Sequence, residues 1–253
     1  MVRVTACTNQ KGGVGKTTTV VNLAAYLALS GTSTLVIDLD PQGNASSGLG
    51  IDRRTLDCSI YDALIARTPI DQLTVGTAID GLDLVPSAPS LSGAEVELVN
   101  VAARERRLAA SLGELNGRYE RVIIDCPPSL GLLTLNALTA ADGVLIPIQT
   151  EYYALEGLSQ LVNTIRLVRQ ELNPRLEIEG VVLTMYDART NLAAQVAGEV
   201  RRHMREAVYD TVVPRSVRLS EAPSHGLPIA LYDPISRGAH AYRDLAVEVT
   251  ARG

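Results

Sequence analysis

The fold of this chain is decided by one short stretch, Gln10-Lys11-Gly12-Gly13-Val14-Gly15-Lys16-Thr17-Thr18. A β-branched run over residues 3–8 precedes it and predicts a strand, and the apolar spacing of residues 18–29 predicts a helix. A glycine-rich loop between a strand and a helix is the context of a phosphate-binding loop. The stretch therefore predicts a site for a nucleoside phosphate at the start of the helix.

The chemistry of the loop follows from its residue types. Glycines let successive backbone N–H groups point at phosphate oxygens, and the N-terminus of the following helix adds positive potential. Lys16 then reaches the β and γ phosphates, and the Thr17 hydroxyl is a ligand for Mg²⁺. A dinucleotide-binding loop of the Rossmann type would need a third glycine where the chain has Thr18.

Predicted strands and helices alternate along the rest of the chain. This order predicts an α/β fold with a doubly wound, mostly parallel sheet and helices on both faces. Residues 43–92 are rich in Gly, Pro and Asp and are expected to form loops and short helices at the rim of the sheet. The other predicted strands are 33–38, 121–125, 143–148 and 179–184, and the other predicted helices are 132–140, 156–172, 191–205 and 239–251.

The composition limits the class of protein. The chain has 253 residues, of which 46% are hydrophobic, so we expect a single domain over residues 1–253. Three widely spaced cysteines without a CxxC pair argue against a disulfide framework and indicate a cytoplasmic protein. No membrane span or signal peptide is visible in the sequence. The net charge of −5 means that binding to nucleic acid needs a local positive patch.

Three aspartates complete the expected site. Residues 122–124 form an apolar run that ends at Asp125, the Walker B arrangement that holds Mg²⁺. Residues 36–37 lead in the same way into Asp38 and Asp40. The carboxyl ends of parallel strands meet at one edge of a sheet, so we expect all three carboxylates beside the loop.

The loop departs from the general G-x-x-x-x-G-K-[ST] pattern, because the first glycine would fall at Gln10. It reads K-G-G-x-G-K-T instead and resembles the deviant Walker A group of P-loop ATPases, which includes the ParA partition ATPases, MinD and nitrogenase iron protein. Over nearly the whole chain the resemblance is to small chromosomal ParA proteins of the Soj type. It is carried by the segments 38–44 (DLDPQGN), 125–129 (DCPPS), 183–187 (LTMYD) and 217–224 (VRLSEAPS).

The resemblance implies an ATPase that binds ATP with Mg²⁺ in a nucleotide-sandwich homodimer. Lys11 would reach phosphates bound by the partner subunit, and Asp40 would position the attacking water. Asp38 would support the metal shell that Thr17 and Asp125 hold. The implied nucleotide-binding set is Lys11, Gly12, Gly13, Val14, Gly15, Lys16, Thr17, Thr18, Met185, Pro214 and Arg215, with Lys11, Lys16 and Asp40 as the catalytic residues.

The resemblance also implies partners. Soj-type proteins are partition ATPases whose ATP dimer binds double-stranded DNA without sequence preference, and the arginines that match Arg189 and Arg218 contact the DNA. Six arginines and four acids lie between residues 186 and 218, a weak patch on one subunit. A ParB-like protein would stimulate hydrolysis and so release the dimer from the nucleoid. The implied function is chromosome or plasmid segregation.

Two other classes stay open at this point. A MinD-like positioning ATPase that cycles on membranes should end in a basic amphipathic helix, whereas residues 242–252 carry Asp244 and Glu248 and only two arginines. An electron-transfer or metal-cluster carrier of the iron-protein kind needs cysteine ligands at the dimer interface, and the three cysteines of this chain are not placed for that.

Overall fold

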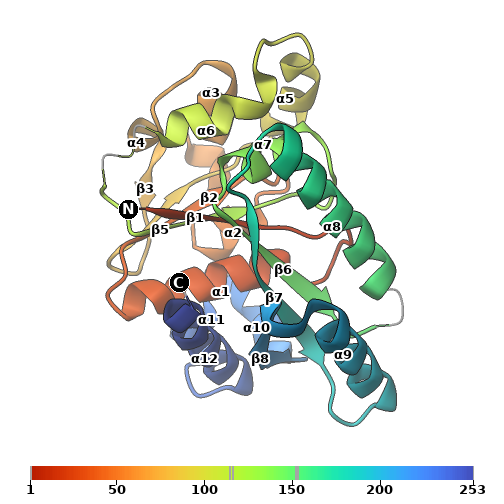
Figure 1. Ribbon diagram of the computed structural model, residues 1–253. Coiled ribbons are helices and arrows are strands. Elements are labelled where there is room, and N and C mark those ends of the chain that lie inside the picture. Colours follow the sequence, from red (N-terminus) through yellow and green to blue (C-terminus); the bar gives the residue numbers. More distant parts are fainter. Residues whose placement is uncertain (1, 114, 116, 152–153, 253) are drawn as a thin grey trace.

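The computed structural model describes residues 2–113, 115, 117–151 and 154–252. Within these residues the sheet has eight strands, β1 (Arg3–Cys7), β2 (Thr34–Asp38), β3 (Val75–Gly76), β4 (Leu82–Val85), β5 (Arg121–Asp125), β6 (Gly143–Gln149), β7 (Glu177–Tyr186) and β8 (Val208–Pro214). Their order is β3-β4-β2-β5-β1-β6-β7-β8, and neighbouring strands are parallel except β3 and β4. The predicted doubly wound, mostly parallel sheet is confirmed (Figure 1).

Helices cover both faces of the sheet. The α-helices are α1 (Lys16–Leu29), α2 (Asn44–Gly48), α3 (Ile60–Ile65), α4 (Ile70–Leu73), α5 (Leu91–Leu98), α6 (Arg107–Leu112), α7 (Leu132–Ala140), α8 (Ala154–Glu171), α9 (Asn191–Met204), α10 (Val217–Glu221), α11 (Ile229–Tyr232) and α12 (Arg237–Arg252), and the 3₁₀ turns are η1 (Arg53–Thr55), η2 (Arg104–Arg106), η3 (Arg205–Ala207) and η4 (Ala222–His225). In Figure 1, α1, α11 and α12 lie below the sheet, and α3, α6 and α7 lie above it. In the part of the chain that the structure describes, no helix is both long enough and apolar enough to cross a membrane.

Each central strand contributes to two hydrophobic cores. Leu35 and Ile37 of β2 are buried in the core under α3, α6 and α7, whereas Val36 between them is buried in the core under α1 and α12. Successive side chains of a strand point to opposite faces of the sheet, so both faces must be apolar when helices cover both. This explains why the strands appear in the sequence as continuous apolar runs.

The stretch from residue 43 to 92 contains more sheet than its composition predicts. The composition predicts loops and short helices there, but β4 pairs with β2 in parallel, with Leu82 beside Thr34. The four-residue strand escapes a periodicity search because Asp83 interrupts its apolar run. That carboxylate is accommodated by the Tyr119 hydroxyl, which donates to it at 2.6 Å. β8 was also not predicted.

The register of the central strands places the functional edge. Cys7 at the end of β1 pairs with Asp125 at the end of β5, and Asp125 pairs with Asp38 at the end of β2. The loop that follows β1 therefore leaves the sheet directly beside both carboxylates.

Candidate functional site: a phosphate loop and its carboxylates

The loop between β1 and α1 turns through two glycines with positive φ. Gly13 has φ 74° and Gly15 has φ 85°, a left-handed conformation that only glycine adopts without steric penalty. Gly15 is the N-cap of α1, and no described side chain caps that helix. The first N–H groups of α1 are therefore available to a ligand, and the helix dipole favours an anion there.

The two lysines of the loop have different environments. Lys16 is buried, with 7% of its surface exposed, and its Nζ donates to the carbonyl oxygen of Lys11 at 3.2 Å. The Lys11 side chain is 37% exposed, and its Nζ donates to Oε2 of Glu151 at 2.9 Å. Lys16 therefore spans the loop, whereas Lys11 lies at the surface of the loop in an exposed ion pair.

Asp125 and Thr17 lie together where the sequence predicts ligands for Mg²⁺. Thr17 Oγ1 donates to Oδ2 of Asp125 at 2.7 Å. Asp125 is fully buried, and its Oδ1 has no hydrogen-bond partner among the described residues. Burial and the neighbouring charge of Asp38 raise the pKa of Asp125 well above its usual range. A buried carboxylate with an unpaired oxygen beside a hydroxyl suits a hard divalent cation, so these residues fit Mg²⁺.

Asp38 and Asp40 organise the segment that follows β2. Oδ2 of Asp38 accepts hydrogen bonds from both the N–H and the hydroxyl of Ser46, each at 2.7 Å, and Oδ1 accepts the N–H of Asp40 at 3.3 Å. Burial raises the pKa of Asp38 to about 6. Asp40 is also buried, and its Oδ1 accepts the N–H of Gln42 at 2.9 Å. Asp38 thus holds α2 in place, and Asp40 lies at the same edge as the loop.

A cavity of about 610 Å³ opens beside the start of α1. Met185, Pro214 and Arg215, which belong to the nucleotide-binding set that the resemblance implies, line this cavity together with Thr17 and Thr18. Its size is typical of a site for a small-molecule ligand. The structure therefore brings these three residues and the end of the predicted phosphate loop to one cavity.

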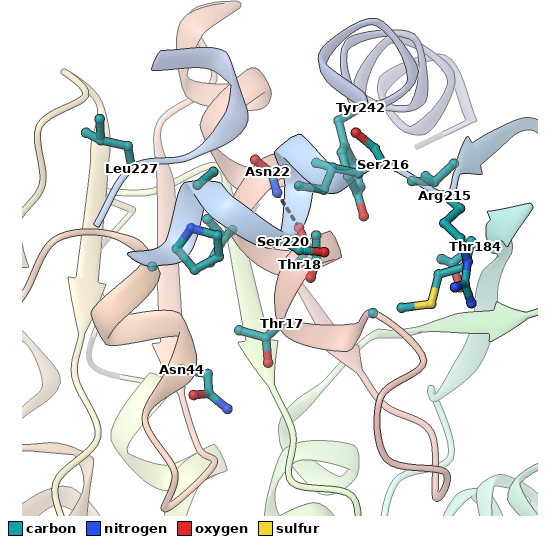
Figure 2. A pocket seen from close by; sticks show the side chains of 18 of the residues that line it. Thr17, Thr18, Asn22, Asn44, Thr184, Arg215, Ser216, Ser220, Leu227 and Tyr242 are labelled. Carbon is teal, nitrogen blue, oxygen red and sulfur yellow. Dashed lines mark hydrogen bonds between the residues drawn. The ribbon is translucent and has the colours of Figure 1, made fainter. Parts of the chain in front are cut away.

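The wall of this cavity at the end of β7 has a strained backbone. Met185 has φ 51°, which is unusual for a residue other than glycine. Strained backbone conformations of this kind cluster at functional sites. In Figure 2, Thr184 and Arg215 lie to one side of Thr17, and Asn44 lies on the other. Both the β7 end and α2 thus form walls of the cavity.

Arg189 and Arg218 lie beyond the carboxyl ends of β7 and β8, at the same edge of the sheet as the phosphate loop. The Arg189 side chain is 88% exposed and pairs with Asp187 at 2.7 Å. The Arg218 side chain is 56% exposed and pairs with Glu221 at 3.0 Å and with Asp233 at 3.3 Å. Both guanidinium groups reach solvent while paired with carboxylates of their own chain.

The arginines between residues 186 and 218 do not form one surface. Arg201 and Arg202 lie near the end of α9 and Arg205 lies directly beyond it, whereas Arg189 precedes the start of that helix. α9 has 14 residues and is therefore about 21 Å long. Arg189 is therefore separated from Arg201, Arg202 and Arg205 by the length of α9.

Two residues at this edge escaped the sequence analysis. Glu151 pairs with Lys11, and the hydroxyl of Thr184 donates to the carbonyl oxygen of Val14 at 2.8 Å. Thr184 and Val14 are 170 positions apart in the sequence, so no local pattern could connect them. The one available signal was the position of Thr184 next to Met185 in the segment 183–187.

The buried charge of Asp125 leads to a prediction for the Asp125→Asn variant. Folding raises the pKa of this carboxyl above the value of about 4 that it has in the unfolded chain. Ionising the carboxyl is therefore harder in the folded state, so the fold loses stability as pH rises from about 4 through the folded-state pKa. In Mg²⁺-free buffer at pH 7 the variant should melt about 3 °C higher, roughly 1 kcal/mol for a chain of this size. The gain should disappear below about pH 4, where the carboxyl is protonated in both states. Calorimetry at both pH values measures this, and a variant less stable than the wild type at pH 7 would contradict it.

Comparison with known proteins assigns the family. The family model described as AAA domain matches residues 2–178. Sporulation initiation inhibitor protein Soj of Bacillus subtilis is 58% identical over 253 residues, which is 100% of both chains. Chromosome partitioning protein ParA of Myxococcus xanthus is 56% identical over 250 residues, covering 99% of this chain and 88% of its own.

A solved structure shares the fold. Cobyrinic acid a,c-diamide synthase from Mycobacterium smegmatis, with bound ADP and magnesium, is 40% identical with a TM-score of 0.85 and covers 98% of this chain and 93% of its own. The similarity to the two partition proteins is higher and extends over nearly the whole chain, beyond the phosphate loop and the strands around it. The chain therefore belongs to the Soj/ParA family of chromosome-partitioning ATPases.

Proposed function

We propose that this chain is the ATPase of a DNA-partition system. It binds ATP and Mg²⁺ at the phosphate loop, forms an ATP-sandwich homodimer, and in that state binds double-stranded DNA without sequence preference. Hydrolysis, stimulated by a ParB-like partner, separates the dimer and releases it from the nucleoid. Family membership supports the partition role. In this proposal residues 1–253 form a single domain that carries the whole cycle.

One observation supports the sandwich dimer most directly, namely the different placement of the two loop lysines. Lys16 is buried and spans the loop, so it can serve only the phosphates of its own subunit. Lys11 is partly exposed and its one ion pair is at the surface, so its ammonium group can leave Glu151 for a phosphate of a second subunit. No other lysine exists in the chain, and 21 arginines serve every other basic position.

The hydrolysis step needs positioning more than strong acid or base chemistry. When bound, Mg²⁺ supplies charge neutralisation at the β and γ phosphates, and Thr17 and Asp125 would hold it. The backbone N–H groups at Gly13, Gly15 and Lys16 hold the phosphate oxygens, while Asp40 orients the attacking water. Asp38 keeps α2 and the segment after β2 in place through its hydrogen bonds with Ser46.

DNA binding is assigned to Arg189 and Arg218. Both side chains are exposed, and their present partners are carboxylates of exposed ion pairs, which water and salt screen. A DNA phosphate can replace those carboxylates without leaving a buried charge unpaired. Phosphate contacts of this kind give affinity without base readout and weaken steeply with salt. Each subunit contributes two arginines, so the dimer carries four of them on a common surface.

The double variant Arg189→Glu/Arg218→Glu tests this assignment. It should lose DNA binding by at least about 100-fold in a filter-binding or fluorescence-anisotropy assay at 50 mM salt, because attraction becomes repulsion at four places per dimer. ATP-dependent dimerisation, measured by sedimentation, should remain.

A matched control has the same change of net charge elsewhere. Arg54 pairs with Asp52 two residues away, as Arg189 pairs with Asp187, and Arg243 has nearly the exposure of Arg218. Arg54→Glu/Arg243→Glu should therefore bind DNA within a few-fold of wild type. Salt-insensitive, undiminished DNA binding by the Arg189/Arg218 variant would refute the assignment.

The membrane-cycling alternative is less well supported by the last helix. The apolar face of α12 is buried against α1, where the Tyr242 hydroxyl lies 3.1 Å from that of Thr19. Arg252 donates to the backbone carbonyl oxygens of Glu206 and Val208. A helix whose apolar face is already packed has none left to insert into a lipid surface.

A further inference from the structure

Thr184 at the end of β7 makes a contact for which the proposed cycle gives no role. Its side chain is buried, with 2% of the residue exposed, and its Oγ1 donates to the carbonyl oxygen of Val14 inside the phosphate loop at 2.8 Å. A Cβ built on Gly15 would lie 3.8 Å from both Cβ and Cγ2 of Thr184. The threonine therefore lies directly against the peptide that joins Val14 to Gly15.

The contact fixes the direction of a backbone donor. The peptide is trans, as no cis peptide bond occurs in the described chain, so the C=O of Val14 and the N–H of Gly15 point in opposite directions. Holding that carbonyl toward β7 therefore holds the Gly15 N–H away from β7. Glycine at φ 85° resists rotation of this peptide less than any other residue would, so the orientation needs an outside partner.

A second contact holds the opposite end of the loop. Asn9 is buried, its Nδ2 donates to the carbonyl oxygen of Pro147 at 2.8 Å, and its Oδ1 accepts the N–H of Lys11 at 3.0 Å. The loop is thus attached to β6 at its start and to β7 near its end. Thr184 itself and the next residue, Met185, line the cavity beside the loop.

We propose that Thr184 is a positioning residue for nucleotide binding, because its hydroxyl sets the Val14–Gly15 peptide so that the Gly15 N–H faces the phosphates. In this role it acts through the carbonyl oxygen of Val14 and not on a reacting atom. The inference deepens the proposed function and depends on nucleotide binding at this loop. Without the hydroxyl the Val14–Gly15 peptide is free to rotate and must be ordered when the nucleotide binds. Loss of the hydroxyl should therefore appear as weaker nucleotide affinity.

The test compares a side chain that loses the hydrogen bond with one that keeps it. Thr184→Val keeps the shape and removes the hydroxyl, and it should weaken binding of Mg·ADP by about tenfold in titration calorimetry. Thr184→Ser keeps the hydroxyl and should bind Mg·ADP within about twofold of wild type. At saturating ATP, kcat of the Val variant should be unchanged while KM rises, which indicates loss of binding shared by ground state and transition state.

A control separates loss of affinity from loss of stability. Thr139→Val removes another buried hydroxyl, one that donates to the carbonyl oxygen of Leu135 at 2.7 Å within α7. It should lower the melting temperature and leave Mg·ADP affinity unchanged. If Thr184→Val does not fold, Thr184→Cys, whose thiol is a weaker donor, should bind more weakly than Thr184→Ser.

The outcomes also separate this inference from the proposed function. A Val variant with wild-type affinity, or a Ser variant as weak as the Val variant, overturns the role of the Thr184 hydroxyl alone. A wild-type protein that binds neither Mg·ADP nor Mg·ATP overturns the proposed function itself.

Discussion

Lys16→Ala should abolish tight ATP binding, whereas Lys11→Ala should bind ATP within a few-fold of wild type and remain monomeric. Lys16 is buried and spans the loop, so in the proposed site its ammonium serves the phosphates of its own subunit. Removing a charge-assisted contact of this kind should weaken binding by about 100-fold. Lys11 is at the surface, and in the proposed sandwich dimer it contributes to affinity only once a second subunit is present.

Titration calorimetry with Mg·ATP and sedimentation in excess ATP measure the two effects separately. Glu151→Gln is the matched control, because it removes the ion pair with Lys11 and keeps the lysine. This variant should still dimerise with ATP, so a monomeric Lys11→Ala protein reports the missing ammonium and not the missing ion pair. A Lys11→Ala protein that sediments as a dimer with ATP would count against the sandwich model.

The central part of the fold could be predicted because its signals are local. The unit of β1, loop and α1 lies within residues 3–29, and the strand that ends at Asp125 lies within residues 121–125, so both are visible as local patterns. Because the carboxyl ends of parallel strands meet at one edge of a sheet, Asp38 and Asp125 are expected to lie together, and the observed register agrees. Strand ends were less well predicted, since β7 begins two residues before and ends two residues after its apolar run of 179–184.

The remaining parts depend on contacts between distant segments. β4 pairs with β2 on one side and with β3 on the other, and its own four residues carry a charge in the middle. The contact of Thr184 with Val14 and the pairing of Arg218 with Asp233 join residues that no periodicity relates. Charge counting likewise groups six arginines into one patch, although α9 separates Arg189 from Arg201 and Arg202.

Asp40→Ala should accumulate an ATP-bound dimer that turns over at least about 100-fold more slowly than wild type. The phosphate loop and both lysines remain intact in this variant, so ATP affinity should stay within a few-fold of wild type. Asp40 is buried at the edge that carries Asp38 and Asp125, a suitable position for orienting a water molecule toward a bound phosphate.

The Oδ1 of Asp40 also accepts the N–H of Gln42, so the alanine variant could lose turnover simply because this turn is disordered. Asp40→Asn separates the two causes, because the amide oxygen can still accept that N–H while the negative charge is gone. Both variants should therefore release phosphate slowly and sediment as dimers long after wild type has returned to monomer. If Asp40→Asn hydrolyses ATP at the wild-type rate, the charge of Asp40 does not orient the water, and the catalytic assignment is wrong.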